Sequence, residues 1–247
     1  MPAPSRSLDG TVIAVTGAGG GIGGATARLA LEAGANVAVA DLRPGAIEAL
    51  QAEFGADRVA ISVGDIRDEA GADALVAAAV SSFGRLDSMV ANAGIGFYGG
   101  IFDYSAEQIR MMVDVNILGT VWSVRAAVRQ FRRQGDGGDI VIMGSVAGLL
   151  IGGGKEAVYS ATKGAQNNLG YALDRELRGE GIRTTVIAPA GVNTPFAAGD
   201  GRFGELAPED GPFMDPGDIA GAVITTLQQP RRMRTELWTM WSLAENH

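Results

Sequence analysis

The chain has 247 residues, 47% of them apolar, with 20 basic and 28 acidic side chains and a formal net charge of −8. This acidic balance argues against nucleic acid or an anionic membrane as a partner, because both favour basic surfaces. Cysteine is absent and the one histidine is His247, so disulfides and thiolate catalysis are excluded and we expect no metal site.

The sequence has no apolar run of about 18 residues, the length that a transmembrane helix needs. The N-terminal stretch MPAPSRSLDG has no apolar segment either. We therefore expect neither a transmembrane helix nor a signal peptide, and a cytoplasmic location. The one basic cluster, at residues 231–234, is short and is interpreted as a solvated turn.

Short apolar, β-branched runs alternate with longer amphipathic segments along the chain. Such alternation is typical of a doubly wound α/β sheet with helices on both faces. The predicted strands cover residues 11–15, 36–40, 59–63, 86–90, 139–143 and 184–188, and the predicted helices cover residues 21–33, 44–54, 68–83, 106–134 and 158–178. No linker or repeat interrupts this pattern, so we expect a single domain over residues 1–247.

The first predicted strand runs into the sequence VTGAGGGIG, where five of the seven residues from Gly17 to Gly23 are glycine. Open α/β sheets bind ligands at the carboxyl ends of their strands. A helix that starts there offers unpaired N–H groups and a positive dipole end to a phosphate. We interpret the turn as a site for a dinucleotide pyrophosphate, although any tight strand–helix turn can use glycine.

Asp41 ends the second predicted strand, 18 residues after Gly23. An acid at that position hydrogen-bonds a ribose 2′-hydroxyl and repels a 2′-phosphate. Arg43 is the only cation nearby, and Leu42 separates it from Asp41. We therefore expect NAD in preference to NADP. The alternative is that Asp41 caps the helix near Pro44.

Tyr159 and Lys163 are four residues apart in a predicted helix, so they share one face. A tyrosine pKa is ordinarily near 10. A neighbouring ammonium lowers the tyrosine pKa, which suits the side chain to acid–base catalysis. Ser145 follows the fifth predicted strand and brings a hydroxyl to the same edge of the sheet. The alternatives are a surface Tyr–Lys pair and a serine that caps the next turn.

In order and spacing these motifs resemble the short-chain dehydrogenase/reductase family, in its compact single-domain branch, over nearly the whole chain. TGAGGGIG matches the branch's TGxxxGxG, GDI at 64–66 matches the adenine-binding acid, and ANAG at 91–94 matches NNAG. Asn116 matches the asparagine of the family's catalytic tetrad, and Ser145, Tyr159 and Lys163 match the other members. The resemblance implies a Rossmann fold with a mostly parallel seven-stranded sheet.

The resemblance also implies a role for each tetrad residue. Tyr159 passes a proton to or from the substrate oxygen, and Ser145 hydrogen-bonds that oxygen. Lys163 holds the nicotinamide ribose, and Asn116 holds a water that links Lys163 to solvent. The implied cofactor contacts are Gly17, Gly19, Gly20, Gly21, Ile22, Gly23, Asp41, Leu42, Asp65, Ile66, Asn92, Ala93, Gly94, Tyr159, Lys163, Pro189, Val192 and Thr194.

The substrate side is expected to be apolar. The candidate pocket residues by resemblance are Ile95, Phe97, Val146, Leu149, Leu150, Ala190 and Phe196. The nearest charges, Lys155 and Glu156, are interpreted as solvated. A loop at about 194–216 is expected to close over the pocket, although packing on its own core explains its aromatic residues equally well.

Three features depart from the family pattern. Ala190 replaces a glycine in PAGVNT, the spacing from Ser145 to Tyr159 is one residue longer than usual, and the C-terminal TELWTMWSLAENH lacks Asp-Gly-Gly. The expected function is hydride transfer between NAD(H) and a neutral, apolar secondary alcohol or ketone. The alternatives are a 3-oxoacyl-thioester reductase, an idle NAD-binding protein, and a lyase or epimerase. Apolar residues on the helices at 106–134 and 158–178 suggest a homo-oligomer, either a dimer or a tetramer.

Overall fold

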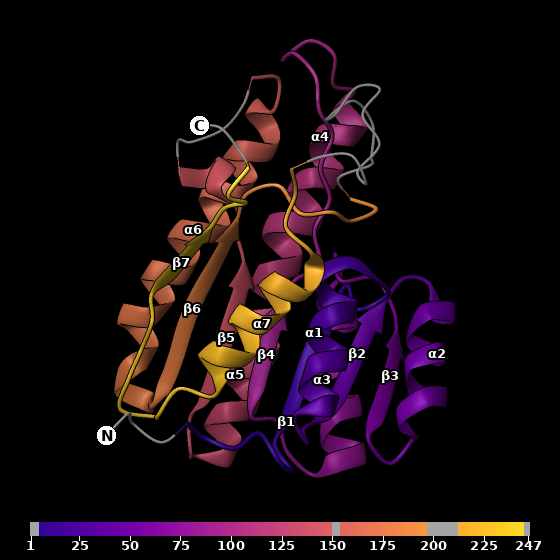
Figure 1. The fold of residues 1–247 in the computed structure, drawn as a ribbon, viewed down its shortest axis with the longest axis vertical. Coiled ribbons are helices and arrows are strands. Elements are labelled where there is room, and N and C mark those ends of the chain that lie inside the picture. Colours follow the sequence, from indigo (N-terminus) through magenta and orange to yellow (C-terminus); the bar gives the residue numbers. More distant parts are fainter. Residues whose placement is uncertain (1–4, 150–153, 197–211, 245–247) are drawn as a thin grey trace.

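The structure, a computed structural model, describes residues 5–149, 154–196 and 212–244. Within these residues, seven strands form one sheet in the order β3-β2-β1-β4-β5-β6-β7, and all neighbouring strands are parallel (Figure 1). The strands are β1 Val12–Thr16, β2 Asn36–Asp41, β3 Val59–Val63, β4 Ser88–Ala91, β5 Gly138–Met143, β6 Ile182–Pro189 and β7 Leu237–Met240. The predicted doubly wound α/β fold is confirmed, and the strand order changes direction at β1 and β4.

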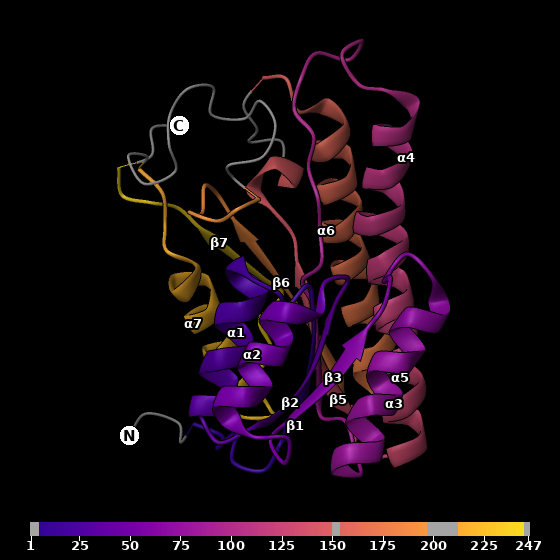
Figure 2. The ribbon, with the colours of Figure 1, turned by 90° about the vertical axis from the view of Figure 1, so that its right-hand side faces the viewer.

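Helices cover both faces of the sheet, with α1, α2 and α7 on one side and α3, α5 and α6 on the other (Figure 2). They are α1 Gly21–Glu32, α2 Pro44–Phe54, α3 Glu69–Phe83, α4 Ala106–Val113, α5 Gly119–Gln134, α6 Ala157–Leu177 and α7 Pro216–Leu227, with the short turns η1 Asp114–Leu118, η2 Val146–Leu149 and η3 Arg178–Glu180. Ile13 and Val15 of β1 pack under the first group, whereas Val12 and Ala14 pack under the second. Both faces of β1 are therefore apolar, as expected of a covered parallel sheet.

No residue range was predicted for two of the longer elements, α7 and β7, although the family resemblance implies a seventh strand. Asp215 caps α7 by accepting a hydrogen bond from the N–H of Gly217 at 2.7 Å, and Pro216 occupies the first turn. This start signal lies at the end of the segment that was interpreted as a loop. Among the described strands β7 pairs with β6 alone, and it consists of only four residues, LWTM, none of which is buried.

Helical residues run without a break from Ala106 to Gln134 through α4, η1 and α5, as the sequence predicts. In the described part of the chain, this is the one helix that is long and apolar enough to cross a membrane, with a mean hydropathy of 1.2 over its most apolar window. Half of that window is buried inside the molecule. Because the core helix of a soluble protein passes the same test, the finding is weak evidence for a span.

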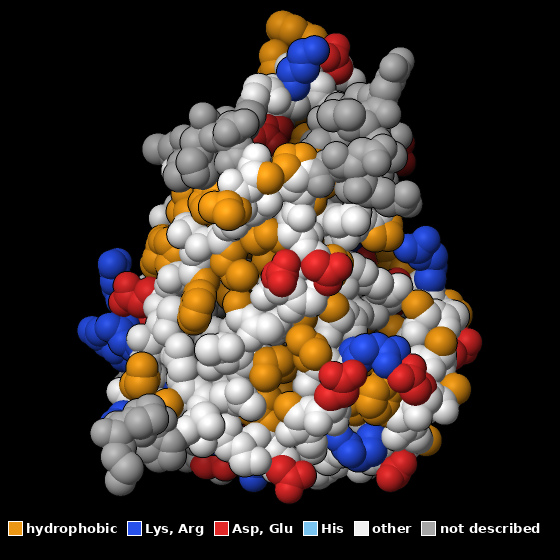
Figure 3. All heavy atoms as spheres, in the orientation of Figure 1, with side chains coloured by type: hydrophobic (Ala, Val, Ile, Leu, Met, Phe, Trp, Pro, Cys, Tyr) orange, Lys and Arg blue, Asp and Glu red, His pale blue; other side chains and the backbone are white. Residues whose placement is uncertain are grey.

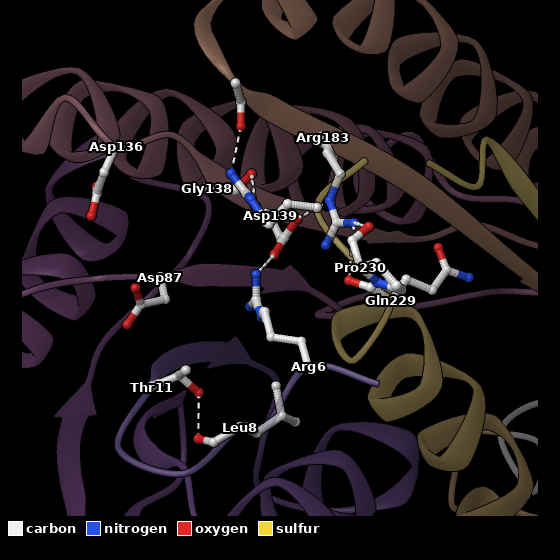
Figure 4. Close-up of polar contacts among 12 residues, drawn as sticks. Arg6, Leu8, Thr11, Asp87, Asp136, Gly138, Asp139, Arg183, Gln229 and Pro230 are labelled. Carbon is white, nitrogen blue, oxygen red and sulfur yellow. Dashed lines mark hydrogen bonds and ion pairs between the residues drawn. The ribbon is translucent and has the colours of Figure 1, made fainter. Parts of the chain in front are cut away.

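Asp139 at the start of β5 has 4% of its side chain exposed and pairs with three arginines (Figure 4). The N–O distances are 2.6 Å to Arg183, 3.0 Å to Arg231 and 3.1 Å to Arg6. Residues 231–234 are exposed and begin with a turn, as interpreted, but Arg231 and Arg234 also pair with the buried carboxylates of Asp139 and Asp174. This cluster lies at the edge of the sheet opposite to the carboxyl ends of the strands.

On the face drawn in Figure 3, basic side chains of the described residues lie among acidic ones and form no extended patch. This distribution agrees with the acidic composition of the chain. The face offers no continuous attraction for a polyanion such as nucleic acid, which binds through clustered Lys and Arg.

Candidate active site

The glycine turn between β1 and α1 leaves no room for side chains at Gly17 and Gly23. Gly17 has a φ of 66°, and a Cβ on it would lie 2.9 Å from the Cα of Ala93. A Cβ on Gly23 would lie 2.2 Å from the carbonyl oxygen of Gly17. At Gly20 a Cβ would meet nothing within 4 Å. α1 starts directly after Gly20 without a side-chain cap, so the first N–H groups of the helix remain available to an anion.

Asp41 at the end of β2 lies against this turn. Its Oδ2 accepts a hydrogen bond from the backbone N–H of Gly19 at 2.9 Å, and its Oδ1 accepts one from that of Arg43 at 3.1 Å. A Cβ on Gly19 would lie 2.6 Å from the carboxylate, so glycine lets the acid approach. Helix α2 has Arg43 as its N-cap and no side-chain cap, so the alternative of Asp41 as a helix cap is wrong.

Thr16 joins the segment after β4 to the end of β1. The Thr16 hydroxyl, 1% exposed, accepts hydrogen bonds from the N–H groups of Asn92 and Ala93, each at 3.0 Å. Asn92 returns a bond from Nδ2 to the carbonyl of Thr16 at 2.9 Å. The ANAG segment is thereby fixed beside the glycine turn, and the loops after β1 and β4 form one wall.

Ser145 follows β5 and is 4% exposed. Its hydroxyl donates to the carbonyl of Pro189 at 3.4 Å and accepts from the N–H of Ala147 at 3.2 Å. The second bond caps the turn η2, so the alternative of a capping serine is correct in part. The first bond places the same hydroxyl between the ends of β5 and β6, where the sequence predicts a catalytic group.

Tyr159 and Lys163 lie on the buried face of α6, and each is 4% exposed. The Lys163 Nζ is 5.8 Å from the centre of the Tyr159 ring and donates to the carbonyl of Met143 at 2.8 Å. The two residues are therefore not a surface pair. Burial lowers the pKa of Lys163 from 10.5 to about 7, because a low-dielectric surrounding disfavours the ammonium.

Asn116 lies in the π-helical turn η1 and is fully buried. Its Oδ1 accepts from the N–H of Ile95, and its Nδ2 donates to the carbonyl of Ile95 and to the hydroxyl of Thr162, all at 2.9 Å. The side chain thus ties the loop after β4 to α6. Its expected role, which is to hold a water beside Lys163, stays a prediction.

A cavity of about 410 Å³ opens at the carboxyl ends of the strands, and it brings most of the predicted site together. The predicted cofactor residues that line it are Gly17, Gly19, Gly20, Gly21, Ile22, Asp41, Asn92, Ala93, Gly94, Tyr159, Lys163, Pro189, Val192 and Thr194. Ser145 lines it as well, together with Ile95, Ala190 and Phe196 of the predicted substrate pocket. Met143, Gly144 and Pro195 also contribute, although no sequence motif singled them out.

Four predicted cofactor residues lie outside the cavity. Gly23 packs against the glycine turn, Leu42 is 61% exposed, and Ile66 packs against the core under α3 and α5. Asp65 pairs with Arg67 at 2.5 Å, and this hydrogen-bonded pairing lowers the Asp65 pKa. The acid that was expected to meet the adenine ring is thus engaged by a neighbour two residues away.

Three residues of the predicted substrate pocket also lie outside the cavity. Val146 is 5% exposed in the core, Leu149 is half-buried, and Phe97 packs in the apolar cluster around Tyr159. Leu150 and residues 197–211 of the expected substrate loop lie outside the described residues. Val192, just before that loop, is joined to Met214 near its end by a parallel bridge.

Tyr98 was not recognised from the sequence, yet its ring contacts both Tyr159 and Phe196. The ring centres are 5.5 Å apart for Tyr98 and Tyr159, 6.5 Å for Tyr98 and Phe196, and 5.8 Å for Tyr159 and Phe196. A Cβ on Gly96 would lie 2.9 Å from both Tyr98 and Phe196. The local signals for this aromatic cluster were Gly96 and the adjacent Phe97, which was itself a predicted pocket residue.

Of the two charges interpreted as solvated, Lys155 is exposed as expected, whereas Glu156 is buried. Lys155 is exposed, but its φ is 63° and its carbonyl accepts hydrogen bonds from the N–H of Gly99 at 2.7 Å and the hydroxyl of Tyr104 at 3.2 Å. Glu156 is only 6% exposed and is the N-cap residue of α6. A carboxylate is therefore buried one helical turn before Tyr159.

The sequence profile of the family described as short chain dehydrogenase matches residues 11–202. An uncharacterized oxidoreductase of Staphylococcus haemolyticus is 34% identical over 223 residues, which are 90% of this chain and 93% of that protein. A similarly named protein of Staphylococcus aureus is 33% identical over the same shares. The chain belongs to the short-chain dehydrogenase family, and it is an oxidoreductase of that family.

Solved structures agree with this assignment. A 3-ketoacyl-(acyl-carrier-protein) reductase from Brucella melitensis, crystallised with NADH, superposes with a TM-score of 0.86 at 29% identity, over 96% of this chain and 99% of that chain. A short-chain type dehydrogenase/reductase from Mycobacterium marinum gives the same TM-score at 25% identity, over 96% of both chains.

Proposed function

We propose that the protein is an NAD(H)-dependent enzyme that interconverts a secondary alcohol and a ketone. The observation that carries the proposal is that Ser145, Tyr159 and Lys163 line one cavity with the glycine turn and Asp41. The NADH in the Brucella melitensis structure supports the choice of cofactor. Incubating the protein with NAD and a panel of secondary alcohols, while following the absorbance band of NADH, tests the proposal. Absence of turnover, with NAD binding demonstrated, would instead favour the idle NAD-binding protein.

The residues present fit a dinucleotide. The open space beside Gly20 and the start of α1 suit the pyrophosphate, and the carboxylate of Asp41 suits a ribose hydroxyl. When bound, the nicotinamide supplies the hydride chemistry. Tyr159 moves a proton at the substrate oxygen, and Ser145 donates a hydrogen bond to that oxygen as charge develops on it. Lys163 holds the ribose beside Tyr159.

NAD is proposed over NADP because of the position of Asp41. Both oxygens of its carboxylate are held by backbone N–H groups, so the charge cannot swing away from a 2′-phosphate. Arg43 also lines the cavity and would attract that phosphate. The proposal therefore requires that Asp41 repels a 2′-phosphate more strongly than Arg43 attracts it. A comparison of kcat/KM with NAD and with NADP tests this.

The substrate is proposed to be neutral and apolar, because the rings of Tyr98 and Phe196 flank the proposed proton donor. A 3-oxoacyl-thioester reductase is the second candidate, favoured by the structural similarity to the Brucella melitensis enzyme. Reduction of a 3-oxoacyl thioester and of a simple ketone, compared under the same conditions, separates the two. A kcat/KM that is higher with the thioester would replace the first candidate.

We also propose that the protein forms a homo-oligomer through α5 and α6. Leu118 at the end of η1 is 37% exposed, and Trp122, Leu169 and Leu173 pack against the core but stay half-buried, so part of this apolar surface is uncovered. Leu177 on α6 and Val128 on α5 do not contribute to this face, because they are 1% and 8% exposed and pack in the core. Light scattering distinguishes a monomer from a dimer or tetramer.

Residues 1–247 are proposed to work as one catalytic unit, with a substrate loop at about 194–216. The described ends of that loop support the proposal, because Asn193 donates its N–H to the carbonyl of Met214 at 2.8 Å and Thr194 lines the cavity. The cytoplasmic location stays a prediction.

A further inference from the structure

We propose that Asn167 is a positioning residue that fixes Ser145 relative to Tyr159. The inference rests on the proposed function, because it presupposes that the Ser145 hydroxyl acts on the substrate. Asn167 is 1% exposed and lies on α6, four residues after Lys163. Its Nδ2 donates a hydrogen bond to the backbone carbonyl of Ser145 at 3.1 Å.

The buried stripe of α6 is polar where an ordinary core helix would be apolar. It includes Tyr159, Thr162, Lys163, Gln166 and Asn167, each at most 4% exposed. Buried polar side chains are destabilising unless they form hydrogen bonds, so each one calls for a reason. For Asn167 the reason is its hydrogen bond to the turn that carries Ser145.

Gly144 makes room for the amide of Asn167, because a Cβ on Gly144 would lie 2.0 Å from the Asn167 Oδ1. Gly148 lets the same turn approach the backbone of α6: a Cβ there would lie 2.4 Å from the carbonyl carbon of Lys163 and 2.7 Å from the Asn167 Nδ2. Neither glycine has a positive φ, so backbone strain does not explain them. The glycine directly before Ser145 therefore leaves the space that the Asn167 amide fills, and Gly148 keeps the serine-bearing turn close to α6.

The Oδ1 of Asn167 is buried and accepts no hydrogen bond from the described residues. A leucine of similar size would fill the same space without leaving a buried acceptor unsatisfied. Packing alone thus does not account for an amide at this position. The bond from Nδ2 to Ser145 does account for it, because only a donor can hold that carbonyl.

Helix α6 consequently holds the serine-bearing segment at two points. Lys163 binds the carbonyl of Met143, and Asn167 binds that of Ser145 two residues later. Since Tyr159 lies on the same helix, the distance between the serine hydroxyl and the tyrosine is set through Asn167. A displacement of about 1 Å in such a pair can lower the rate about 100-fold.

The test is a double-mutant cycle with Asn167→Leu and Ser145→Ala. Asn167→Leu should lower kcat about 10–100-fold. The KM for NAD should stay close to the parental value, because Asn167 does not line the cavity. Ser145→Ala should lower kcat about 100-fold or more in the parent but much less in the Asn167→Leu background, because the serine is already misplaced there. A merely structural role of Asn167 would leave the two effects additive.

Asn168→Leu is the matched control, since Asn168 is the next residue, is exposed, and donates only to the carbonyl of Gly164 within α6. It should leave kcat unchanged. If Asn167→Leu does not fold, Asn167→Asp keeps the shape, lacks the donor when ionised, and completes the cycle. If Ser145→Ala lowers kcat in the parent and the effects of the two substitutions on kcat are additive, the role of Asn167 is overturned while the proposed role of the serine stands. A harmless Ser145→Ala in the parent overturns it together with the proposed role of the serine.

Discussion

The carboxylate of Asp41 accepts a hydrogen bond from the backbone N–H of Gly19 at 2.9 Å. The acid proposed to select NAD therefore also holds the turn proposed to bind the pyrophosphate. This double contact depends on glycine, because a Cβ at position 19 would lie 2.6 Å from the carboxylate. A change at Asp41 should thus affect the binding of either cofactor as well as the choice between them.

Replacing Asp41 by Ala should weaken the binding of NAD and reduce the difference in kcat/KM between NAD and NADP. Loss of hydrogen bonds to a charged group costs about 1.5–3 kcal/mol, so kcat/KM for NAD should fall about tenfold or more. Arg43→Ala is the control, and it should lower kcat/KM with NADP more than with NAD. Measuring both cofactors with all three proteins checks this. A parent that prefers NADP would show that Arg43 outweighs Asp41.

Tyr159→Phe should abolish turnover and leave NAD binding nearly intact. The phenol is the proposed proton donor, and general acid–base catalysis contributes about 10²–10⁴-fold. The ring contacts with Tyr98 and Phe196 remain in the variant, so the apolar packing is preserved. Steady-state rates together with NAD titration by fluorescence are the measurements. Nearly parental activity would exclude Tyr159 as the proton donor.

Local motifs allowed much of this site to be predicted from the sequence. The glycine turn, Asp41 and the Tyr–Lys pair each show their chemistry within a few residues, and the structure brings them to one cavity. The contacts of Asn167 and Tyr98 could not be predicted in this way, because each joins segments that are far apart in the chain.

Prediction of the fold from local sequence has the same limit. Six strands, including β3 at one edge of the sheet, were recognised within two residues of their ends. β7 at the other edge was missed, because it has only four residues and none of them is buried. The burial of Glu156 was missed because a charged residue at the start of a helix reads as solvated. In both cases the deciding factor is what packs against the segment, which the segment's own sequence does not contain.

The buried Lys163 should make stability depend on pH. Below its folded pKa of about 7 the side chain is charged in both states, and the folded state bears the full cost of burying the ammonium. Between about 7 and 10.5 the unfolded chain still binds the proton that the folded protein has released, so this cost falls as pH rises.

Lys163→Met removes the ammonium, so the Tm of the variant minus that of the parent should be largest near pH 7 and shrink toward about pH 10. Thermal melts of the cofactor-free proteins across this range are the measurement. Lys155→Met is the control, because Lys155 is exposed and its Tm difference should not vary with pH. If the Tm difference for Lys163→Met does not change with pH, the lysine pKa is the same in the folded and unfolded states.

Asp139→Asn should destabilise the fold without altering cofactor binding. Its carboxylate pairs with Arg231 and, as Figure 4 shows, with Arg6 and Arg183. Asp139 lies at the start of β5, whereas the cavity opens at the carboxyl ends of the strands. Breaking a buried ion pair costs about 3–5 kcal/mol. Asp136→Asn is the control, because its pair with Arg85 is about half exposed and should be worth under about 1 kcal/mol. Urea unfolding of the three proteins checks the difference, and equal losses would mean that the three-arginine cluster adds little.

The rings of Tyr98 and Phe196 form an aromatic wall beside Tyr159, and this wall gives a prediction about substrate size. The rings of Tyr98 and Phe196 approach each other edge to face above Gly96, and Phe196 lines the cavity. Phe196→Ala should raise KM for a bulky apolar alcohol more than for a small one, because only the larger substrate reaches the lost ring. The difference should be at most about 1.5–3 kcal/mol, the free energy of burying one such side chain.

Phe102→Ala is the matched control for Phe196→Ala, since Phe102 is 98% exposed and should leave KM unchanged for both alcohols. The ratio of the two KM values within each protein cancels any general loss of folded enzyme. If Phe196→Ala shifts both KM values equally, the ring supports the fold and does not contact the substrate. If it lowers KM for the bulky alcohol, the aromatic wall restricts the pocket, and the natural substrate is smaller than the apolar lining suggests.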